Sequence, residues 1–233
     1  IENKYGTCCT LSDIQDARNV AQKIGIPFYV SDMEVEFKSA VIDDFISEYL
    51  AGRTPNPCVR CNEKVKFSRL VDWTLDLGAD FLATGHYARV IRNDRFELHR
   101  ATSLEKDQSY FLFSIMENDL SRCVFPLGEI AKDKVRELAR YFGLSVSNKP
   151  DSQEICFVQG RSYQEFVEKN VPLDARRPGL IVDESGRTVG EHAGLYQFTV
   201  GQRRGLGLNS LEPKFVVNLD VDRNLVMVGK EES

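Results

Sequence analysis

Two cysteines, Cys58 and Cys61, stand three positions apart in a segment rich in basic side chains. The thiolate is the nucleophile in cysteine chemistry, and neighbouring cations or a helix N-terminus lower the pKa of a thiol. Arg60 and Lys64 would supply such cations. Three interpretations stay open: a reactive thiol pair, half of a zinc site that needs two further ligands, or buried cysteines without chemistry. Because the sequence has no second CxxC or CxxH, the reactive pair is favoured.

A third cysteine, Cys156, lies between Ile155 and Phe157. Taken alone, this segment is typical of a small buried residue in a strand. The other three cysteines lie beside no comparable charge cluster and are interpreted as structural: Cys8, Cys9 and Cys123. Six cysteines in 233 residues are too few for a disulfide scaffold. We therefore expect a reducing, cytoplasmic environment.

The segment around the cysteine pair is basic within an acidic chain. The formal net charge of the whole chain is −5. Residues 53–69 carry one acidic side chain, Glu63, and five basic ones: Arg53, Arg60, Lys64, Lys66 and Arg69. Such a patch suits a phosphate-rich partner such as nucleic acid. The alternative is a solvated helix face.

Two shorter motifs could also contact a ligand. Glycine lets a backbone approach a ligand closely, so Gly85 is a candidate, and His86 beside it could contact a phosphate or a base. The alternative is a loop histidine whose neighbours satisfy it. Lys106, Asp107 and Gln108 place a cation, an acceptor and an amide in series, again with an ordinary loop as the alternative. Neither HExxH, GxSxG nor a phosphate-cradling glycine loop occurs in the sequence.

The elements that must position these residues alternate between helix and strand in the first part of the chain. Hydrophobic periodicity predicts helices at 12–24, 37–49 and 65–77, and buried strands at 26–30 and 79–84. This order is typical of an α/β domain with a parallel sheet, in which ligands lie beyond the carboxyl ends of the strands. The pair Gly85 and His86 follows one such end.

The later part of the chain is richer in glycine and in hairpins. Turn residues predict three hairpins, at 87–100, 180–189 and 215–228, and periodicity predicts a helix at 131–142.

The composition is globular, with 42% apolar and 28% charged residues, and excludes a disordered, collagen-like or coiled-coil chain. No apolar run approaches the ~20 residues of a membrane span, so no membrane association is expected.

Five motifs, taken together in order and spacing, resemble the tRNA-specific 2-thiouridylases. They are residues 54–62 (TPNPCVRCN), 83–89 (ATGHYAR), 106–111 (KDQSYF), 151–157 (DSQEICF) and the glycine-rich 194–207. The resemblance implies an α/β fold: a parallel-sheet, adenine-nucleotide α-hydrolase-like (PP-loop) domain over 1–160, a small central tRNA-binding domain over 161–212, and the beginning of a β-barrel over 213–233. The family's SGGxDS phosphate loop is expected before Ile1, and most of the barrel after Ser233.

The resemblance also implies a reaction, ATP-dependent 2-thiolation of the wobble uridine of tRNA through adenylation of the base and a cysteine persulfide. ATP, with Mg²⁺ as its usual counter-ion, would be a cofactor. The partners would be the anticodon stem-loop of tRNA and a cysteine desulfurase or sulfur-relay protein that donates the persulfide sulfur.

Site residues carry over by position in the motifs. Cys156 would hold the persulfide sulfur, and Cys61 would be the second catalytic cysteine, forming a disulfide with Cys156 as sulfur is released. The remaining contacts implied are to the target base by Asn56, Pro57 and Cys58, to ATP by Gly85, and to tRNA by His86, Lys106, Asp107 and Gln108.

One position departs from the family pattern, because many members have Asp, with an acid/base role, where this chain has Cys58. Either Cys58 takes over that catalytic role or the proton comes from elsewhere. Two other functions are considered: a PP-loop ATP-dependent ligase or amidotransferase, which would not need Cys156, and a zinc-stabilised RNA-binding module built on Cys58 and Cys61.

Overall fold

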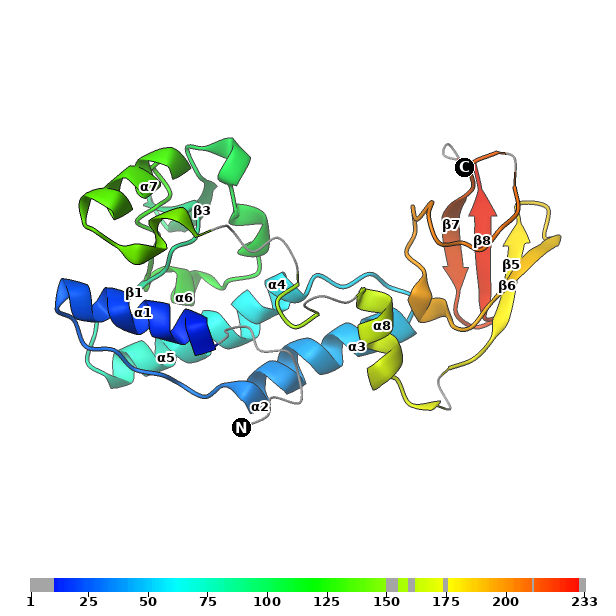
Figure 1. The fold of residues 1–233 in the computed structure, drawn as a ribbon, viewed down its shortest axis with the longest axis horizontal. Coiled ribbons are helices and arrows are strands. Elements are labelled where there is room, and N and C mark those ends of the chain that lie inside the picture. Colours follow the sequence, from blue (N-terminus) through cyan, green and yellow to red (C-terminus); the bar gives the residue numbers. More distant parts are fainter. Residues whose placement is uncertain (1–10, 150–154, 159–161, 174–175, 211, 231–233) are drawn as a thin grey trace. The chain divides into compact units, whose positions relative to one another are not determined.

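The structure is a computed structural model that describes residues 11–149, 155–158, 162–173, 176–210 and 212–230. Contacts within the chain divide it into two compact units (Figure 1). The first unit comprises Ile1–Val41 and Pro57–Gln159, and the second comprises Ile42–Asn56 and Gly160–Ser233.

The first unit is built mostly from helices. Its longer helical segments are α1 (Leu11–Ile24), α2 (Glu34–Phe37), α4 (Pro57–Cys61), η2 (Asn62–Lys66), α5 (Arg69–Asp76), α6 (Glu117–Leu120) and α7 (Lys132–Tyr141). Three of the predicted helix ends are confirmed: α1, α5 and α7 are each followed by a glycine with a φ between +65° and +76°, at Gly25, Gly78 and Gly143. Glycine adopts this left-handed conformation without the steric cost of a side chain.

Four short strands complete the first unit. The predicted hairpin is confirmed by β2 (Ala88–Arg92), which pairs antiparallel with β3 (Phe96–Arg100). A parallel pair also forms, between β1 (Leu82–Ala83) and β4 (Cys123–Val124). This pair is shorter than the strand predicted at 79–84. The core beneath them contains Phe67, Val71, Ala88, Leu112, Leu120, Cys123 and Phe125.

The strand predicted at 26–30 is wrong. The segment forms neither helix nor strand, and Ile26, Tyr29 and Val30 are exposed. A strand is stable only when a neighbour satisfies its backbone groups, and no described strand pairs with this segment. Its apolar composition was therefore not sufficient to place it in a sheet.

In its described residues, the second unit contains a four-stranded sheet and two α-helices. The sheet order is β6-β5-β8-β7, formed by β5 (Gly179–Asp183), β6 (Thr188–His192), β7 (Phe215–Asp220) and β8 (Leu225–Gly229). Both predicted hairpins are thus confirmed, and β5 and β8 pair in parallel across them. The sheet joins strands on both sides of the domain boundary predicted after residue 212.

The two helices of the second unit come from distant parts of the sequence. They are α3 (Asp43–Leu50) and α8 (Tyr163–Asn170). Aromatic rings join them: Tyr49 stacks on Tyr163 with centroids 4.8 Å apart, and Phe45 meets Phe166 at 6.2 Å. The predicted domains placed 42–56 with the first part of the chain, whereas its contacts assign it to the second unit.

Candidate active site

The cysteine pair lies on a helix rather than before one. Cys58 and Cys61 both belong to α4, which begins at Pro57, a residue suited to the first helical turn because it has no N–H to leave unpaired. The next turn, η2, is a π-helix, and its wider hydrogen bond runs from the Phe67 N–H to the Asn62 carbonyl over 2.9 Å. The helix predicted to begin near Val65 therefore begins two turns earlier.

The π turn changes which side chain follows the cysteines along the helix. In an unbroken α-helix, Val65 would follow Cys58 and Cys61 on one face, whereas the extra residue of a π turn moves Lys66 to that position. Val65 is accordingly buried, and the positive charge of Lys66 acts on both thiols. Lys66 is the functional candidate that sequence reasoning missed as an individual residue.

Cys156 joins the cysteine pair from a distant part of the chain. Its thiol is close enough to those of Cys58 and Cys61 to act electrostatically on both. The ring of Phe157 packs edge-on against Phe37 at 5.8 Å and fixes this segment in the first unit. Phe157 and Val158 are buried, whereas Cys156 is half-buried. Residues 151–154 of the same motif lie outside the described residues.

The thiols of the pair do not have the lowered pKa that the sequence predicted. The pKa of Cys61 is raised to about 11, chiefly by burial; Lys66 acts to lower it, and the sulfurs of Cys156 and Cys58 add to the rise. Burial also raises the pKa of Cys58, with a contribution from Cys156. The predicted activating cations face elsewhere, because Arg60 and Lys64 both contact Glu63, at 3.2 and 2.7 Å.

Ion pairs also occupy the rest of the basic segment. Arg69 faces Glu36 at 3.7 Å, and Arg53 contacts Glu48 at 2.6 Å within the second unit. No ion pair involves Lys66 among the residues that the structure describes. The sequence count of five cations against one acid therefore overstates the charge available to a ligand, and Lys66 is the cation that faces the thiols.

His86 also lies within electrostatic reach of Lys66. Its Nδ1 atom is 2.8 Å from the Thr84 hydroxyl, and its ring packs against Phe67 with centroids 5.5 Å apart. Burial, with a smaller contribution from Lys66, lowers the pKa of His86 to about 4. The imidazole is consequently neutral at pH 7. These contacts are those expected of a loop histidine whose neighbours satisfy it. The neutral ring could still form a hydrogen bond with a base.

Gly85 is exposed at the carboxyl end of the parallel pair. It lies two residues after the end of β1, where an α/β fold places its ligand. A side-chain carbon added to Gly85 would meet only the Leu127 Cδ1 atom, at 3.8 Å. Nothing in the fold therefore requires glycine here, and the open backbone is suited to a nucleotide.

Three residues of the Lys106 loop were predicted to contact RNA, and two of them, Asp107 and Gln108, form hydrogen bonds within the chain that hold the loop in place. The Asp107 carboxylate accepts hydrogen bonds from the Ala101 N–H at 2.7 Å and from the Ser109 hydroxyl at 2.7 Å. Gln108 exchanges hydrogen bonds with Tyr87, whose N–H donates to the Gln108 side chain at 3.0 Å. Lys106 is exposed. Asp107 and Gln108 thus have structural roles of their own, and Lys106 is directed to solvent.

The remaining two predicted base contacts fall on either side of the unit boundary. Pro57 is buried at the start of α4 in the first unit, and Asn56 is half-buried in the second.

Among the described residues, no group of three or more His, Cys, Asp or Glu side chains is placed to hold a metal ion. No helix in the described part of the chain is long and apolar enough to cross a membrane.

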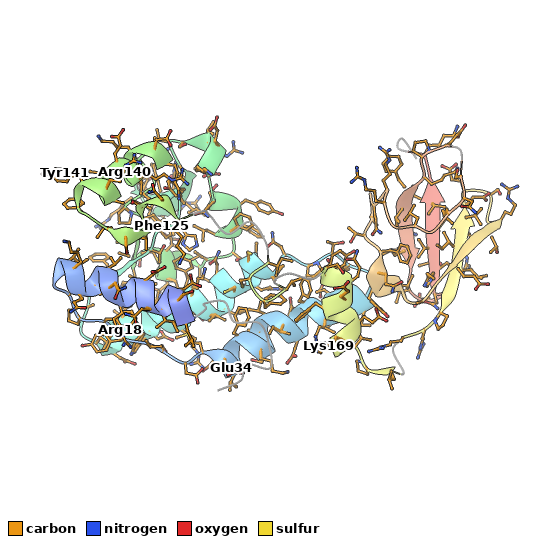
Figure 2. The ribbon with its side chains drawn as sticks, viewed as in Figure 1. Arg18, Glu34, Phe125, Arg140, Tyr141 and Lys169 are labelled. Carbon is orange, nitrogen blue, oxygen red and sulfur yellow. The ribbon has the colours of Figure 1, made fainter. Side chains whose placement is uncertain are left out.

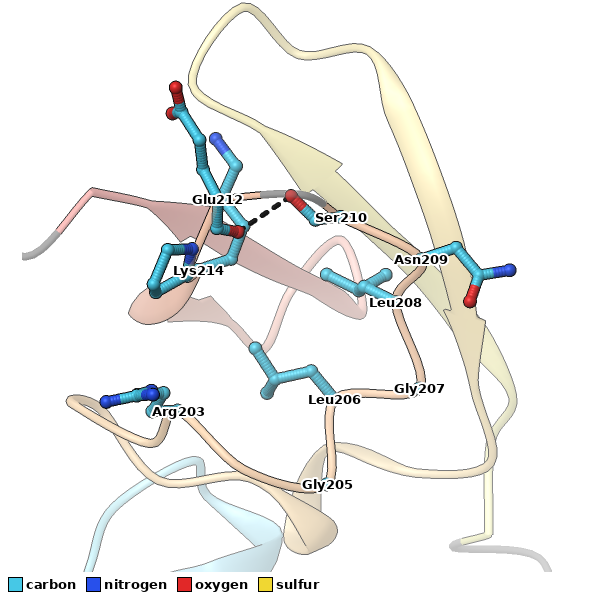
Figure 3. Close-up of a pocket in the computed structure, with 10 residues that line it drawn as sticks. Arg203, Gly205, Leu206, Gly207, Leu208, Asn209, Ser210, Glu212 and Lys214 are labelled. Atoms are coloured by element: carbon cyan, nitrogen blue, oxygen red, sulfur yellow. Dashed lines mark hydrogen bonds between the residues drawn. The ribbon is translucent and has the colours of Figure 1, made fainter.

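A pocket of about 530 Å³ lies in the second unit, beside the glycine-rich segment (Figure 3). Leu206 and Leu208 lie along it, and the Ser210 hydroxyl donates to the Glu212 carbonyl at 2.8 Å. The Gln202 side chain braces the start of the loop by accepting from the Thr199 N–H at 3.0 Å. The residues that line the pocket belong to the second unit, whereas the three thiols belong to the first.

Comparisons with known proteins match both parts of the chain. Residues 1–160 match the family profile described as the tRNA methyl transferase HUP domain, and residues 164–230 match the tRNA methyl transferase PRC-barrel domain. The chain is similar to proteins named tRNA-specific 2-thiouridylase MnmA. That of Geobacter metallireducens is 52% identical over 98% of this chain and 62% of its own length. That of Zymomonas mobilis is 53% identical over 99% and 62%. The chain spans about three fifths of the length of these relatives.

Proposed function

Because the chain belongs to the family of the tRNA-specific 2-thiouridylases, we propose that the protein is a tRNA sulfurtransferase that replaces the C2 oxygen of the wobble uridine with sulfur. The observation that supports this most directly is the gathering of three thiols, two of which, Cys58 and Cys61, are also within electrostatic reach of Lys66. Cys58 and Cys61 come from α4, and Cys156 comes from a segment almost a hundred residues later. A sulfur relay needs such neighbours, because one thiol must carry the sulfur and another must release it.

The two essential thiols have different tasks in this proposal. Cys156, which is half-buried, accepts a sulfur atom from a donor protein and holds it as a persulfide. The outer sulfur then bonds to C2 of the uracil, the bond from C2 to its activated oxygen breaks, and that oxygen would leave with the adenylyl group as AMP. The thiolate of Cys61 attacks the inner sulfur of Cys156. The Cys156 sulfur–sulfur bond breaks, a disulfide between Cys61 and Cys156 forms, and the electron pair leaves on the 2-thio base. A reductant must regenerate both thiols.

The raised pKa values of Cys58 and Cys61 fit a site in which the thiols react one after another, in a fixed order. At neutral pH, Cys61 is protonated at rest, because its pKa is about 11. A protonated thiol does not attack a newly loaded persulfide. Lys66 favours the thiolate form of Cys61. In this proposal, Cys61 loses its proton only once the bound substrate has changed the surroundings of the thiol. Cys58, whose pKa is also raised, is a proton donor placed beside the same reaction.

ATP is the proposed cofactor, with Mg²⁺ as its counter-ion. When bound, it supplies the adenylyl group that makes the uracil C2 oxygen able to leave. Gly85, exposed at the carboxyl end of β1, would let the nucleotide approach the backbone. His86, neutral at pH 7, adds no charge to that approach.

The proposed substrate is the anticodon stem-loop of tRNA. A base that reacts with the half-buried thiols of Cys61 and Cys156 must leave the anticodon stack, as bases do in other enzymes that modify them. Lys106 is exposed for contact with phosphates, and Arg60 and Lys64 lie at the surface of the cysteine helix. A cysteine desulfurase or a sulfur-relay protein is the proposed sulfur donor.

Substitution of Cys156 by serine tests the proposal. In the full-length protein, Cys156→Ser should abolish formation of 2-thiouridine, because serine cannot hold a persulfide, while RNA affinity changes little. Mass spectrometry of nucleosides from treated tRNA measures the product, and Cys123→Ser is the matched control, since Cys123 lies in the hydrophobic core. Thiolation that survives in Cys156→Ser would exclude this mechanism. ATP turnover that persists without any thiolated product in the wild type would favour the ligase or amidotransferase alternative.

A further inference from the structure

Two aromatic side chains are exposed beside the cysteine helix. Tyr110 and Phe113 are 65% and 66% exposed, and their ring centroids lie 6.1 Å apart. They stand three positions apart around the short 3₁₀ helix η4 (Ser109–Phe111), a spacing that puts side chains on the same face. Water solvates aromatic rings poorly, so a fixed pair of exposed rings is a typical binding surface.

The turn that carries this pair is firmly anchored. Leu112, which lies between the two rings in sequence, is fully buried in the core of the first unit. On the other side, the Asn62 amide donates to the Phe111 carbonyl at 2.9 Å. Asn62 is only 3% exposed, so this hydrogen bond is shielded from solvent. The backbone between Tyr110 and Phe113 is held from both sides, which keeps the rings in place before any ligand arrives.

The anchor also ties the aromatic pair to the thiols. Asn62 follows Cys61 directly in the chain, and η4 packs against α4. Exposed cations lie on neighbouring segments: Lys106 in the same loop, and Arg60 and Lys64, which contact Glu63, on α4 and η2. A ligand that suits the surface therefore combines flat, polarisable rings with negative charge. Single-stranded RNA has both features.

We propose that Tyr110 and Phe113 form a stacking platform for an unpaired base of the RNA loop that flanks the base at the thiols. The inference rests on the proposed function and adds to it a contact that orients the loop. With one neighbouring base held on the platform, the target uridine would be positioned as it leaves the stack. Stacking accepts any base, so the platform would contribute affinity and orientation rather than sequence selectivity.

The test compares aromatic pairs within the same unit. Tyr110→Ala and Phe113→Ala should each weaken binding of an unmodified anticodon stem-loop by about tenfold, as loss of one stacked base does. Tyr110→Phe should bind normally, because stacking needs the ring and not the hydroxyl. Tyr141→Ala is the matched control: Tyr141 is 83% exposed, lies at the end of α7, and has Phe142 as its partner at 5.2 Å (Figure 2).

Fluorescence gives a second readout that a structural role would not move. A stem-loop with 2-aminopurine beside the target uridine should be quenched on binding to the wild type and not to Tyr110→Ala. Equal affinity of Tyr110→Ala and wild type, or an equal loss in Tyr141→Ala, would overturn the platform. So would a concentration-dependent dimer that Tyr110→Ala abolishes, because a second copy would then be the occupant. Wild-type thiolation in Tyr110→Ala with normal affinity would refute the platform alone, whereas the proposed function fails only if Cys156→Ser still thiolates.

Discussion

At the scale of single residues, Lys66 connects the groups on which the site depends. Its charge lowers the pKa of Cys58 and of Cys61, and it also lowers the pKa of His86. Lys66 acts to lower the pKa of the thiols and that of the imidazole, but for different reasons. A cation stabilises a thiolate, so the thiol loses its proton more easily, and the same cation repels an imidazolium ion. One ammonium group therefore favours the anionic form of the thiols and the neutral form of the imidazole.

Removing that charge should shift both titrations upward. In Lys66→Gln, we expect the pKa of Cys61 to rise above about 11 and that of His86 to rise above about 4. Alkylation of Cys61 by iodoacetamide at a fixed alkaline pH should then slow, measured in a background without the other two thiols of the site. NMR titration reports His86. Lys64→Gln, whose lysine contacts Glu63, should change neither value. An unchanged alkylation profile in Lys66→Gln would mean that Lys66 does not face Cys61.

At the scale of elements, two glycines near β1 and β2 separate a structural requirement from a functional one. A side-chain carbon at Gly128 would lie 1.9 Å from the Ala88 carbonyl oxygen, in the fully buried start of β2. At Gly85 the nearest atom would be 3.8 Å away, an ordinary contact. The fold itself therefore requires Gly128 and tolerates a methyl group at Gly85.

This contrast predicts opposite outcomes for two alanine variants. Gly128→Ala should lower the free energy of unfolding by about 1–3 kcal/mol or more, because the backbone of β2 must move. Gly85→Ala should leave it within about 0.5 kcal/mol. If Gly85 approaches ATP, Gly85→Ala should nevertheless weaken nucleotide binding by the full-length protein. Urea unfolding and calorimetric titration measure the two effects. Nucleotide affinity unchanged in Gly85→Ala would remove Gly85 from the proposed site.

Elements determined by local sequence were predictable, and those determined by distant partners were not. Glycine after α1, α5 and α7, and turn residues between paired strands, located helix ends and hairpins correctly. The segment 26–30 has the composition of a strand, but a strand also needs a neighbour that no local pattern reveals. The π turn at η2 was equally hidden, because a search for a 3.6-residue period assumes an unbroken α-helix.

The candidate site shows the same limit. Residue type and motif order identified the three thiols, and the structure brings them within electrostatic reach of one another. The direction of the pKa shifts of Cys58 and Cys61 could not be predicted, because burial by distant side chains outweighs the nearby charges. The cations counted from sequence also differed from those available in the fold, since Glu36 lies far from Arg69 along the chain but faces it.

At the scale of the whole molecule, charge must favour a polyanion locally and oppose it globally. The chain carries −5 overall, a charge that would repel the proposed RNA substrate at long range. Around the cysteine helix, Arg60 and Lys64 share one carboxylate, Glu63, whose pKa those contacts lower. Glu63 is therefore fully charged at neutral pH and competes with phosphate for both cations. The acid, rather than the number of basic residues, limits how strongly this surface attracts RNA.

Neutralising Glu63 should consequently strengthen RNA binding. We expect Glu63→Gln to raise affinity for the anticodon stem-loop about threefold at low salt, the effect of one charge several ångströms away in water. The gain should shrink as salt rises, because mobile ions screen it and replace the released counter-ions. Filter binding across a salt series measures both effects. Glu137→Gln is the matched control, since Glu137 holds Lys134 at 2.8 Å on α7 and likewise has a lowered pKa. Equal gains in the two variants would show that RNA responds to total charge and not to the cysteine helix.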